Sequence, residues 1–396
     1  MRIRTKPTKP KIKQLLEYLR TPNQGEVDNI LLITVILIII IGITVLFSAS
    51  SAYSWERYGN SHTYLMHQVI YGFVGGAVSA FILYKLPFEF LKKYPVLFFL
   101  GSLFFMLMVF LPGIGVEQNS ARRWVDLGFF QFQPAELVKL YFIIYLAAWV
   151  DRHQKNIKER TVLIPFLILL GLLALFLILQ PDFSTLVLIG VISGVIYFVA
   201  GAPWKYLAGL LILGLVVGWV AIASEDYRRD RAETFFQECI DAPDPLGTGY
   251  HICRATTAIG SGRITGQGIN QGIQHQGVGS LPEAMNDSIF AVLANETGFL
   301  GSCLLIILFV VLLFRSFVIA QRAQSQFTAY VAIGIAIWIF FQAAVNIGAM
   351  LNIVPVTGMP LPFVSYGSSS LITVLGAMGL LLHISTQQNK SKRNTI

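Results

Sequence analysis

Charged residues are scarce in this sequence. Asp, Glu, Lys and Arg make up 13% of its 396 residues, whereas hydrophobic residues make up 55% and the mean hydropathy is +0.66. A soluble protein of this length would carry roughly a quarter charged residues, so an ordinary soluble domain is excluded. The apolar runs are continuous rather than alternating, which excludes a strand-period barrel. We therefore expect an all-α, polytopic membrane protein.

Cysteine is also scarce, with three in the chain. Cys303 falls in an apolar run, where we expect it only to pack. Cys239 and Cys253 fall in one long polar segment, where a disulfide would be permitted in an oxidising compartment, although spacing alone does not prove pairing. Potential metal ligands form no cluster with clear spacing, so no cofactor is assigned. A divalent cation remains an open alternative as a cofactor.

Ten apolar segments have lengths near the ~20 residues that a helix needs to cross a bilayer. They cover residues 29–50, 64–84, 94–111, 134–150, 161–179, 184–201, 206–223, 287–314, 327–350 and 369–386. The transmembrane domain therefore covers 29–386, between a basic tail at 1–28 and a second tail at 387–396. A large loop at 224–286 separates the seventh and eighth spans.

The net charge of +8 has a topological explanation. Lys and Arg are concentrated in the two tails and in the loops on the same side of the membrane as the tails. By the positive-inside rule, both termini are cytoplasmic and the loop 224–286 faces the cell exterior or periplasm. The basic charge is thereby explained without a nucleic-acid partner.

The most informative stretch, residues 281–298, lies where the long outer loop gives way to the eighth span. It contains Glu283 and Asp287, four residues apart. An aspartate at the start of a helix can be a cap, because the free N–H groups and the helix dipole stabilise negative charge there. A carboxylate at the edge of the hydrocarbon is costly, however, and such groups commonly mark functional sites. Position alone leaves both interpretations of Asp287 open.

The segment 112–140 brings further charges to the outer surface. Arg122 and Arg123 precede a tryptophan and could simply snorkel to the interface. They lie on the side that the positive-inside rule disfavours, so an anion should compensate them, and a lipid pyrophosphate matches the guanidinium fork. Glu136 and Lys139 are three residues apart on the next helix and should pair on one face, either as a structural ion pair or in a functional role.

Three other segments have features of turns or irregular backbone. Asp182 stands between two spans and is expected to cap the second of them. The loop 224–286 is too long for a passive connection, and its glycine-rich stretch 258–269 is neither a P-loop nor a dinucleotide fingerprint, so we expect a semi-structured lid over a membrane cavity. The stretch 355–370 is rich in Pro, Gly and Ser and contains Ser365. Such backbone is tolerated at membrane depth where it is buried in protein or lines a cavity.

Seven segments together resemble the SEDS family of bacterial shape, elongation, division and sporulation proteins, which includes RodA, FtsW and SpoVE. They are residues 121–124, 133–140, 180–182, 247–250, 258–268, 281–298 and 360–370. They occur in family order along nearly the whole chain. The stretches 48–53 and 360–367 are closer to FtsW than to RodA.

The resemblance implies a peptidoglycan glycosyltransferase. Such an enzyme polymerises lipid II, the undecaprenyl-pyrophosphate-linked disaccharide peptide, at the outer face of the bacterial cytoplasmic membrane, for cell division or elongation. The resemblance also implies a class B penicillin-binding protein as partner. The family's essential aspartate falls on Asp287, and around it this chain has Met285, Asn286 and Ser288 where His, Thr and Phe are usual.

The chemistry open to these residues agrees with that implication. A carboxylate can take the proton of an attacking sugar hydroxyl as general base, a role for Asp287. Cations must stabilise the departing pyrophosphate, a role for Arg122, Arg123 and Lys139. The remaining expected substrate-binding residues are Glu136, Glu283 and Ser365.

Two alternatives belong to other functional classes. A flippase that moves lipid II could use the same charges and cavity, but its signature would be discontinuous helices in two repeat-related halves, and the sequence has no convincing internal repeat. A non-catalytic scaffold that only recruits a transpeptidase would leave Asp287 and the glycine-rich lid without a purpose.

Overall fold

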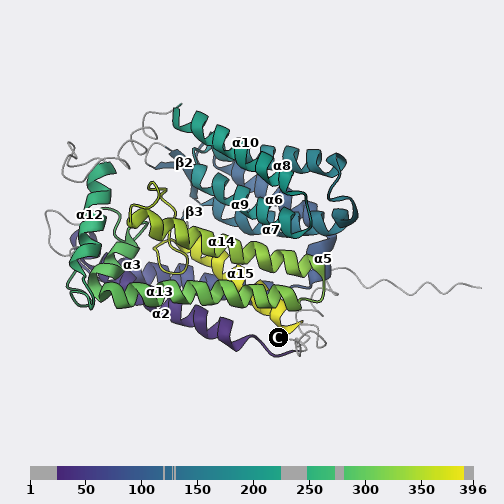
Figure 1. The fold of residues 1–396 in the computed structure, drawn as a ribbon. Helices are drawn as coiled ribbons and strands as arrows, with labels where there is room; N and C mark the ends of the chain where they lie inside the picture. Colours follow the sequence, from purple (N-terminus) through teal and green to yellow (C-terminus); the bar gives the residue numbers. More distant parts are fainter. Residues whose placement is uncertain are drawn as a thin grey trace, which may run out of the picture.

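The computed structural model describes residues 25–118, 121–126, 128, 131–223, 248–272 and 281–387. Within those ranges the chain is a bundle of long helices with one small sheet (Figure 1). The predicted second span is built from α3 (Thr63–His67), η1 (Gln68–Val74) and α4 (Gly75–Lys85). The other predicted spans coincide with α2 (Asn29–Tyr58), α6 (Pro95–Met108), α7 (Pro134–His153), α8 (Arg160–Leu179), α9 (Phe183–Val199), α10 (Trp204–Ala223), α13 (Ile289–Arg322), α14 (Gln326–Met350) and α15 (Ser368–Thr386). Shorter helices between spans are α5 (Phe88–Lys93), η2 (Gln154–Asn156) and α12 (Thr248–Ser261).

Among the described residues, length and composition identify six segments that could cross a membrane on their own: α2, Thr63–Lys85, α8, α13, α14 and α15. α6 and α9 are apolar but shorter. Many large apolar side chains on the outside of the bundle are exposed, among them Ile33, Phe81, Phe104, Ile168 and Phe314. Their exposure would be unfavourable in water but not in hydrocarbon. The prediction of an all-α, polytopic membrane protein is therefore confirmed.

Helix ends follow from the local sequence. Asp28 precedes α2, and its side chain accepts the N–H of Leu31 at 2.9 Å and pairs with Arg315 of α13. Asp182 caps α9 as predicted, accepting the N–H of Thr185 at 3.1 Å. Each cap gives a partner to a backbone donor that the helix leaves free.

Small residues allow the central helices to approach closely. α15 packs along α4, where a side chain at Gly76 or Gly379 would overlap Leu375 or the backbone of Ala80. Close approach of this kind is typical of helices packed within membranes. α14 lies between α13 on one side and α7 and α9 on the other (Figure 1). Residues on α14 can therefore join the two parts of the bundle.

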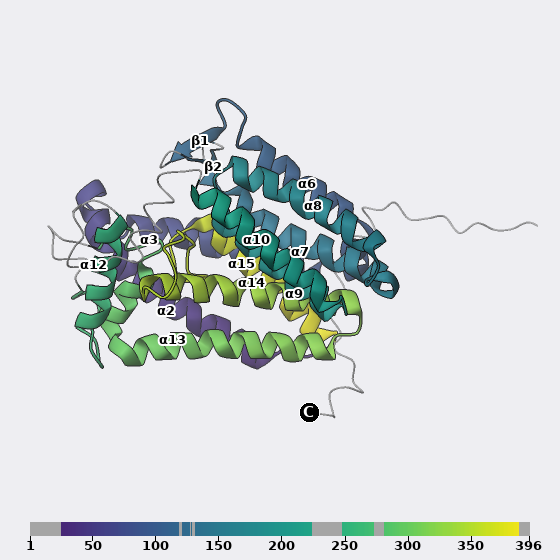
Figure 2. The same cartoon turned by 45° about the horizontal axis from the view of Figure 1, so that its top comes forward.

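A small antiparallel sheet joins α6 to α7, and the sequence did not predict it. Its strands are β1 (Gly115–Gln118), β2 (Ala121–Asp126) and β3 (Gln131–Phe132), in the order β1-β2-β3 (Figure 2). Val125 pairs with Phe132, and both side chains pack with Val109 in a cluster of their own.

Helix α12 lies across the end of the bundle, beside the start of α13 (Figures 1 and 2). It belongs to the predicted loop 224–286, of which residues 224–247 and 273–280 lie outside the described ranges. Cys253 on α12 is disulfide-bonded and Cys303 is free. Cys239 lies outside the residues that the structure describes.

α13 is broken at Gly298, whose φ of 67° and ψ of −162° are not helical. The segment that follows α12 pairs with the backbone groups that the break leaves free. Phe299 and Leu300 donate their N–H groups to the carbonyls of Arg263 and Ile264 at 2.9 and 3.2 Å. A Cβ at position 298 would lie 2.5 Å from the Ile264 oxygen, so the position requires glycine. Irregular backbone is stable here because other residues of the protein supply its hydrogen-bond partners.

Candidate functional site

The predicted site residue Asp287 lies in a tight turn just before α13. The turn depends on Glu283, whose φ of 49° is left-handed and whose carbonyl accepts the N–H groups of Asn286 (3.0 Å) and Ser288 (3.2 Å). The Glu283 side chain is exposed and accepts a hydrogen bond from the Asn286 amide at 2.5 Å. α13 begins at Ile289 with Ser288 as its N-cap, so Asp287 lies one residue outside the capping position.

The main chain of Asp287 is bonded to α14. The side-chain amide of Asn346 donates to the carbonyls of Asp287 (2.9 Å) and Met359 (2.8 Å). Both acceptors are carbonyl oxygens, which fixes the orientation of the amide, since only its nitrogen can donate. A Cβ added at Gly358, where φ is 70°, would lie 4.0 Å from an Asp287 carboxylate oxygen. The Pro- and Gly-rich segment therefore lies directly against the turn.

Ser365, predicted from the same segment, supports this turn. Its hydroxyl donates to the carbonyl of Asn286 at 2.6 Å and accepts the N–H of Leu361 at 2.8 Å. The N–H of Tyr366 donates to the carbonyl of Met285 at 2.8 Å. Ser365 is buried, so its role in the structure is to hold the turn rather than to face an open cavity.

Glu136 and Lys139 form the predicted ion pair, with 2.8 Å between Nζ and Oε1 and with side chains only 4% and 2% exposed. Lys139 also donates to Oε1 of Gln342 at 3.0 Å and lies 5.3 Å from the centre of the Trp338 ring. The second Glu136 oxygen has no hydrogen-bond partner among the described residues. Removing two charges from water is unfavourable unless each is paired, so the partners depend on one another.

Gln342 and Asn346 were missed by the sequence reasoning. Gln342 accepts from Lys139 and from the indole N–H of Trp338 at 2.9 Å, and it donates to the carbonyl of Pro360 at 2.8 Å. Gln342 and Asn346 are one helical turn apart on α14, and they donate to the carbonyls of the adjacent residues Pro360 and Met359. Since Asn346 also bonds to the carbonyl of Asp287, α14 connects the ion pair to the backbone of Asp287. The available signal was the pair of amides, four residues apart, in an otherwise apolar span.

The structure gives the two arginines of β2 different environments. Arg123 donates to the carbonyls of Gln180 (3.1 Å) and Pro181, so its guanidinium is engaged within the protein. The Arg122 side chain is 58% exposed and pairs only with Glu117 at 3.3 Å among the contacts of the described residues. Such an exposed pair contributes little stability and leaves the guanidinium accessible to an anion.

Asp126 is the last residue of β2 in the same sheet. Its carboxylate accepts from the Gln131 side chain at 2.9 Å and from the N–H of Gly128 at 2.7 Å. These two hydrogen bonds hold the pKa of the Asp126 carboxyl below its ordinary value, because they favour the ionised form. The group is therefore ionised at neutral pH and stabilises the loop that follows β2.

A second buried carboxylate, Glu296 of α13, was also missed. It accepts hydrogen bonds from the Ser48 hydroxyl and from the N–H of Asn270 at 3.2 Å, and Ser51 bonds to the Asn270 side chain at 3.3 Å. The small polar stretch 48–53 therefore lies inside α2 and contacts the segment that follows α12.

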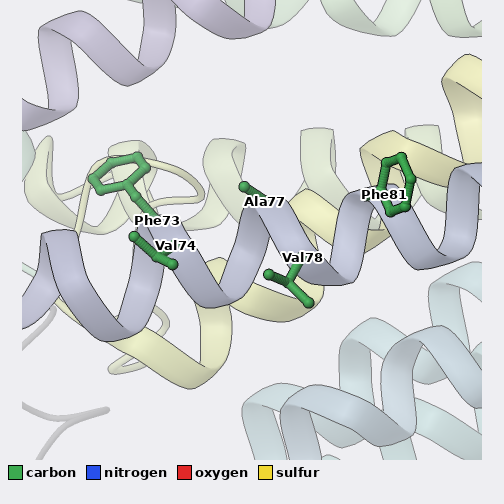
Figure 3. A pocket seen from close by; sticks show the side chains of 5 residues that line it. All are labelled: Phe73, Val74, Ala77, Val78 and Phe81. Carbon is green, nitrogen blue, oxygen red and sulfur yellow. The ribbon is translucent and has the colours of Figure 1, made fainter.

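An open apolar pocket of about 460 Å³ lies elsewhere, on η1 and α4 (Figure 3). Phe73, Val74, Ala77, Val78 and Phe81 line it, and none of these can transfer a proton. This pocket therefore offers no acid–base group, unlike the polar site around Asp287. Within the described ranges no three His, Cys, Asp or Glu side chains gather as a metal site would require.

Comparison with known proteins agrees with this architecture. The family model described as "Cell cycle protein", FtsW/RodA/SpoVE, matches residues 28–390. "Probable peptidoglycan glycosyltransferase FtsW" of Thiomicrospira cyclica is 39% identical over 363 residues, covering 90% of this chain and 91% of the relative. "Stage V sporulation protein E" of Bacillus subtilis is 34% identical over 368 residues, covering 92% and 98%.

Solved structures give the same result. Thermus thermophilus RodA has a TM-score of 0.68 at 27% identity, with 93% of this chain and 100% of that chain covered. A chain from a peptidoglycan synthase complex has a TM-score of 0.73 at 29% identity, with 93% and 99% covered. The FtsW names among the relatives agree with the FtsW-like features of the sequence. This chain belongs to the FtsW/RodA/SpoVE family.

Proposed function

We propose that this protein is a peptidoglycan glycosyltransferase that polymerises lipid II at the outer face of the bacterial cytoplasmic membrane. One observation carries the proposal: the main chain of Asp287 is bonded to α14, while its carboxylate lies outside the capping position of α13. A carboxylate held in this way can act on a substrate. The names of the relatives support the same activity.

In the proposed reaction, a sugar hydroxyl of one glycan attacks the anomeric carbon of another. A new carbon–oxygen bond forms, the bond from that carbon to the pyrophosphate oxygen breaks, and the pyrophosphate leaves with the bonding electrons. Asp287 takes the hydroxyl proton as general base, which contributes roughly 10²–10⁴-fold to the rate. The bonds from Asn346 and Ser365 keep this base within reach of the proton.

The leaving pyrophosphate needs positive charge. Arg122 is exposed and offers a guanidinium fork that matches phosphate oxygens, so we assign it this role. Arg123 holds the backbone at 180–181, and Lys139 braces the site through Glu136 and Gln342. A divalent cation would enter with the pyrophosphate and take most of its ligands from the phosphate oxygens.

We also propose a class B penicillin-binding protein as the partner. The similar chain from a peptidoglycan synthase complex belongs to an assembly in which polymerization and crosslinking are coordinated. A transpeptidase would crosslink the glycan that this chain makes. The charge distribution supports cytoplasmic tails at 1–28 and 387–396, with Asp287 on the outer side, where polymerised glycan is needed.

The proposal is tested with the purified complete protein, its transpeptidase partner and purified lipid II. We expect glycan polymers of many disaccharides, detected after separation by size. Movement of lipid II between the leaflets of a vesicle, without any polymer, would support a flippase instead. Recruitment of the transpeptidase without polymer or lipid movement would support a scaffold.

A further inference from the structure

Ser288, the residue after Asp287, makes an unusual use of its hydroxyl. It is the N-cap of α13, where a serine normally accepts a hydrogen bond from the first turn, yet its side chain makes no capping bond. The hydroxyl is buried and lies 2.5 Å from Nε2 of His251 on α12. The Ser288 hydroxyl therefore bonds to α12 instead of capping α13, and it links α12 to the turn that contains Asp287.

Ser288 is well placed to transmit this contact. Its N–H donates to the Glu283 carbonyl at 3.2 Å, and its own carbonyl accepts the N–H of Ala291 at 2.9 Å. Ser288 therefore both closes the turn and begins the helix. A shift of its side chain toward or away from His251 would also move the adjacent Asp287.

The contact is independent of the other bonds between α12 and α13. At the far end of α12, the Asn295 amide donates to the Ala258 carbonyl at 3.0 Å and to the Ser261 hydroxyl at 2.6 Å. Those bonds would dock the helix without His251. The imidazole is thus not needed to attach α12, and its contact with Ser288 acts on the site.

We propose that His251 is a positioning residue for Asp287, because its imidazole holds the hydroxyl of the adjacent Ser288. This inference rests on the proposed function. Neither residue belongs to the site expected from the sequence.

The test is the steady-state kinetics of lipid II polymerisation by the complete protein with its transpeptidase partner. We expect His251→Ala to lower kcat about tenfold with KM within about twofold, as for a lost hydrogen bond that acts on the transition state. Ser288→Ala should match it, and the double variant should be no worse than either. His251→Gln can still bond to Ser288, so it should restore kcat to within about threefold of the wild type.

Asn295→Ala is the matched control, because it removes two buried bonds between α12 and α13 without touching Ser288. We expect a lower melting temperature with kcat within about twofold of the wild type. The inference is overturned if His251→Ala and Ser288→Ala keep wild-type kinetics, or if Asn295→Ala reproduces their loss. Polymerisation by the wild type is measured first: its absence contradicts the proposed function and this inference together, whereas wild-type turnover with unaffected His251 variants contradicts only the role of His251.

Discussion

Gln342 and Asn346 supply most of the rigidity behind Asp287. The oxygen of Gln342 accepts from both Lys139 and Trp338, so its nitrogen must face the carbonyl of Pro360. Asn346 is fixed in the same way by two carbonyl acceptors. Each amide can therefore adopt only one orientation, and the backbone of Asp287 is held by a group that does not titrate.

The ion pair behind Gln342 can be tested by pairwise substitution. Lys139→Met leaves Glu136 buried without its cation, which we expect to destabilise the protein by about 3–5 kcal/mol. The double variant Glu136→Gln with Lys139→Met should regain most of that stability. Its polymerisation should stay low, because Gln342 loses one of the two donors that fix its amide. Thermal unfolding in detergent measures the effect on stability, and lipid II turnover measures the effect on activity. Full recovery of turnover in the double variant would show that the Glu136–Lys139 pair contributes only to packing.

Substitutions of Arg122 and Arg123 should have different effects, the first on turnover and the second on stability. Arg122→Ala should lower turnover roughly 10- to 100-fold with little change in melting temperature, since it loses a charged contact to pyrophosphate and only an exposed pair in the protein. Arg123→Ala should lower the melting temperature, because it breaks bonds to the carbonyls of Gln180 and Pro181. Arg122→Lys should already impair turnover, since a point charge does not replace the fork. Near-normal turnover in Arg122→Ala would indicate a snorkelling role.

Among the helices, the break in α13 has the clearest structural consequence. Besides the bonds at Phe299 and Leu300, the N–H groups of Gln267 and Gly268 donate to the carbonyls of Asn295 and Glu296 at 2.9 and 3.0 Å. The segment that follows α12 therefore replaces the helical partners on both sides of Gly298. A discontinuous helix is common in transporters, but here the free backbone groups bind protein rather than cargo.

Gly298→Ala should disrupt this arrangement. The new Cβ would meet the Ile264 carbonyl, and alanine would be strained at a φ of 67°, so we expect a loss of at least about 1–2 kcal/mol in the free energy of unfolding. Gly171→Ala in α8 is the control, because a Cβ there meets nothing within 4 Å and alanine favours a helix. Thermal unfolding compares the two, and equal stability would show that the break tolerates a side chain.

The overall architecture could be read from the sequence because continuous apolar runs encode membrane helices directly. All ten predicted spans coincide with helical segments, and Asp182 caps α9 as its position suggested. The break at Gly298 was not foreseen, because the apolar run continues through it. The bonds from Asn346 to Asp287 and from His251 to Ser288 join residues distant in sequence, so no local pattern could reveal them.

The orientation in the membrane follows from charge and can be measured directly. In a protein without its natural cysteines, Thr257→Cys on the exposed face of α12 should react with an impermeant thiol reagent on intact spheroplasts. Gln154→Cys, exposed in the predicted inner loop, should react only after lysis. The reverse pattern would place Asp287 on the cytoplasmic side, away from the proposed reaction.

The most direct measurement is lipid II polymerisation by Asp287→Asn in the complete complex with the transpeptidase. We predict a rate lower by roughly 10²–10⁴-fold, as expected for loss of a general base. The melting temperature and partner binding should be unchanged, since asparagine keeps the size and the main-chain bond to Asn346. Glu283→Gln should lose far less, because the Glu283 carbonyl, rather than its carboxylate, holds the turn. Wild-type polymerisation by Asp287→Asn would contradict the assignment of Asp287 as the catalytic base.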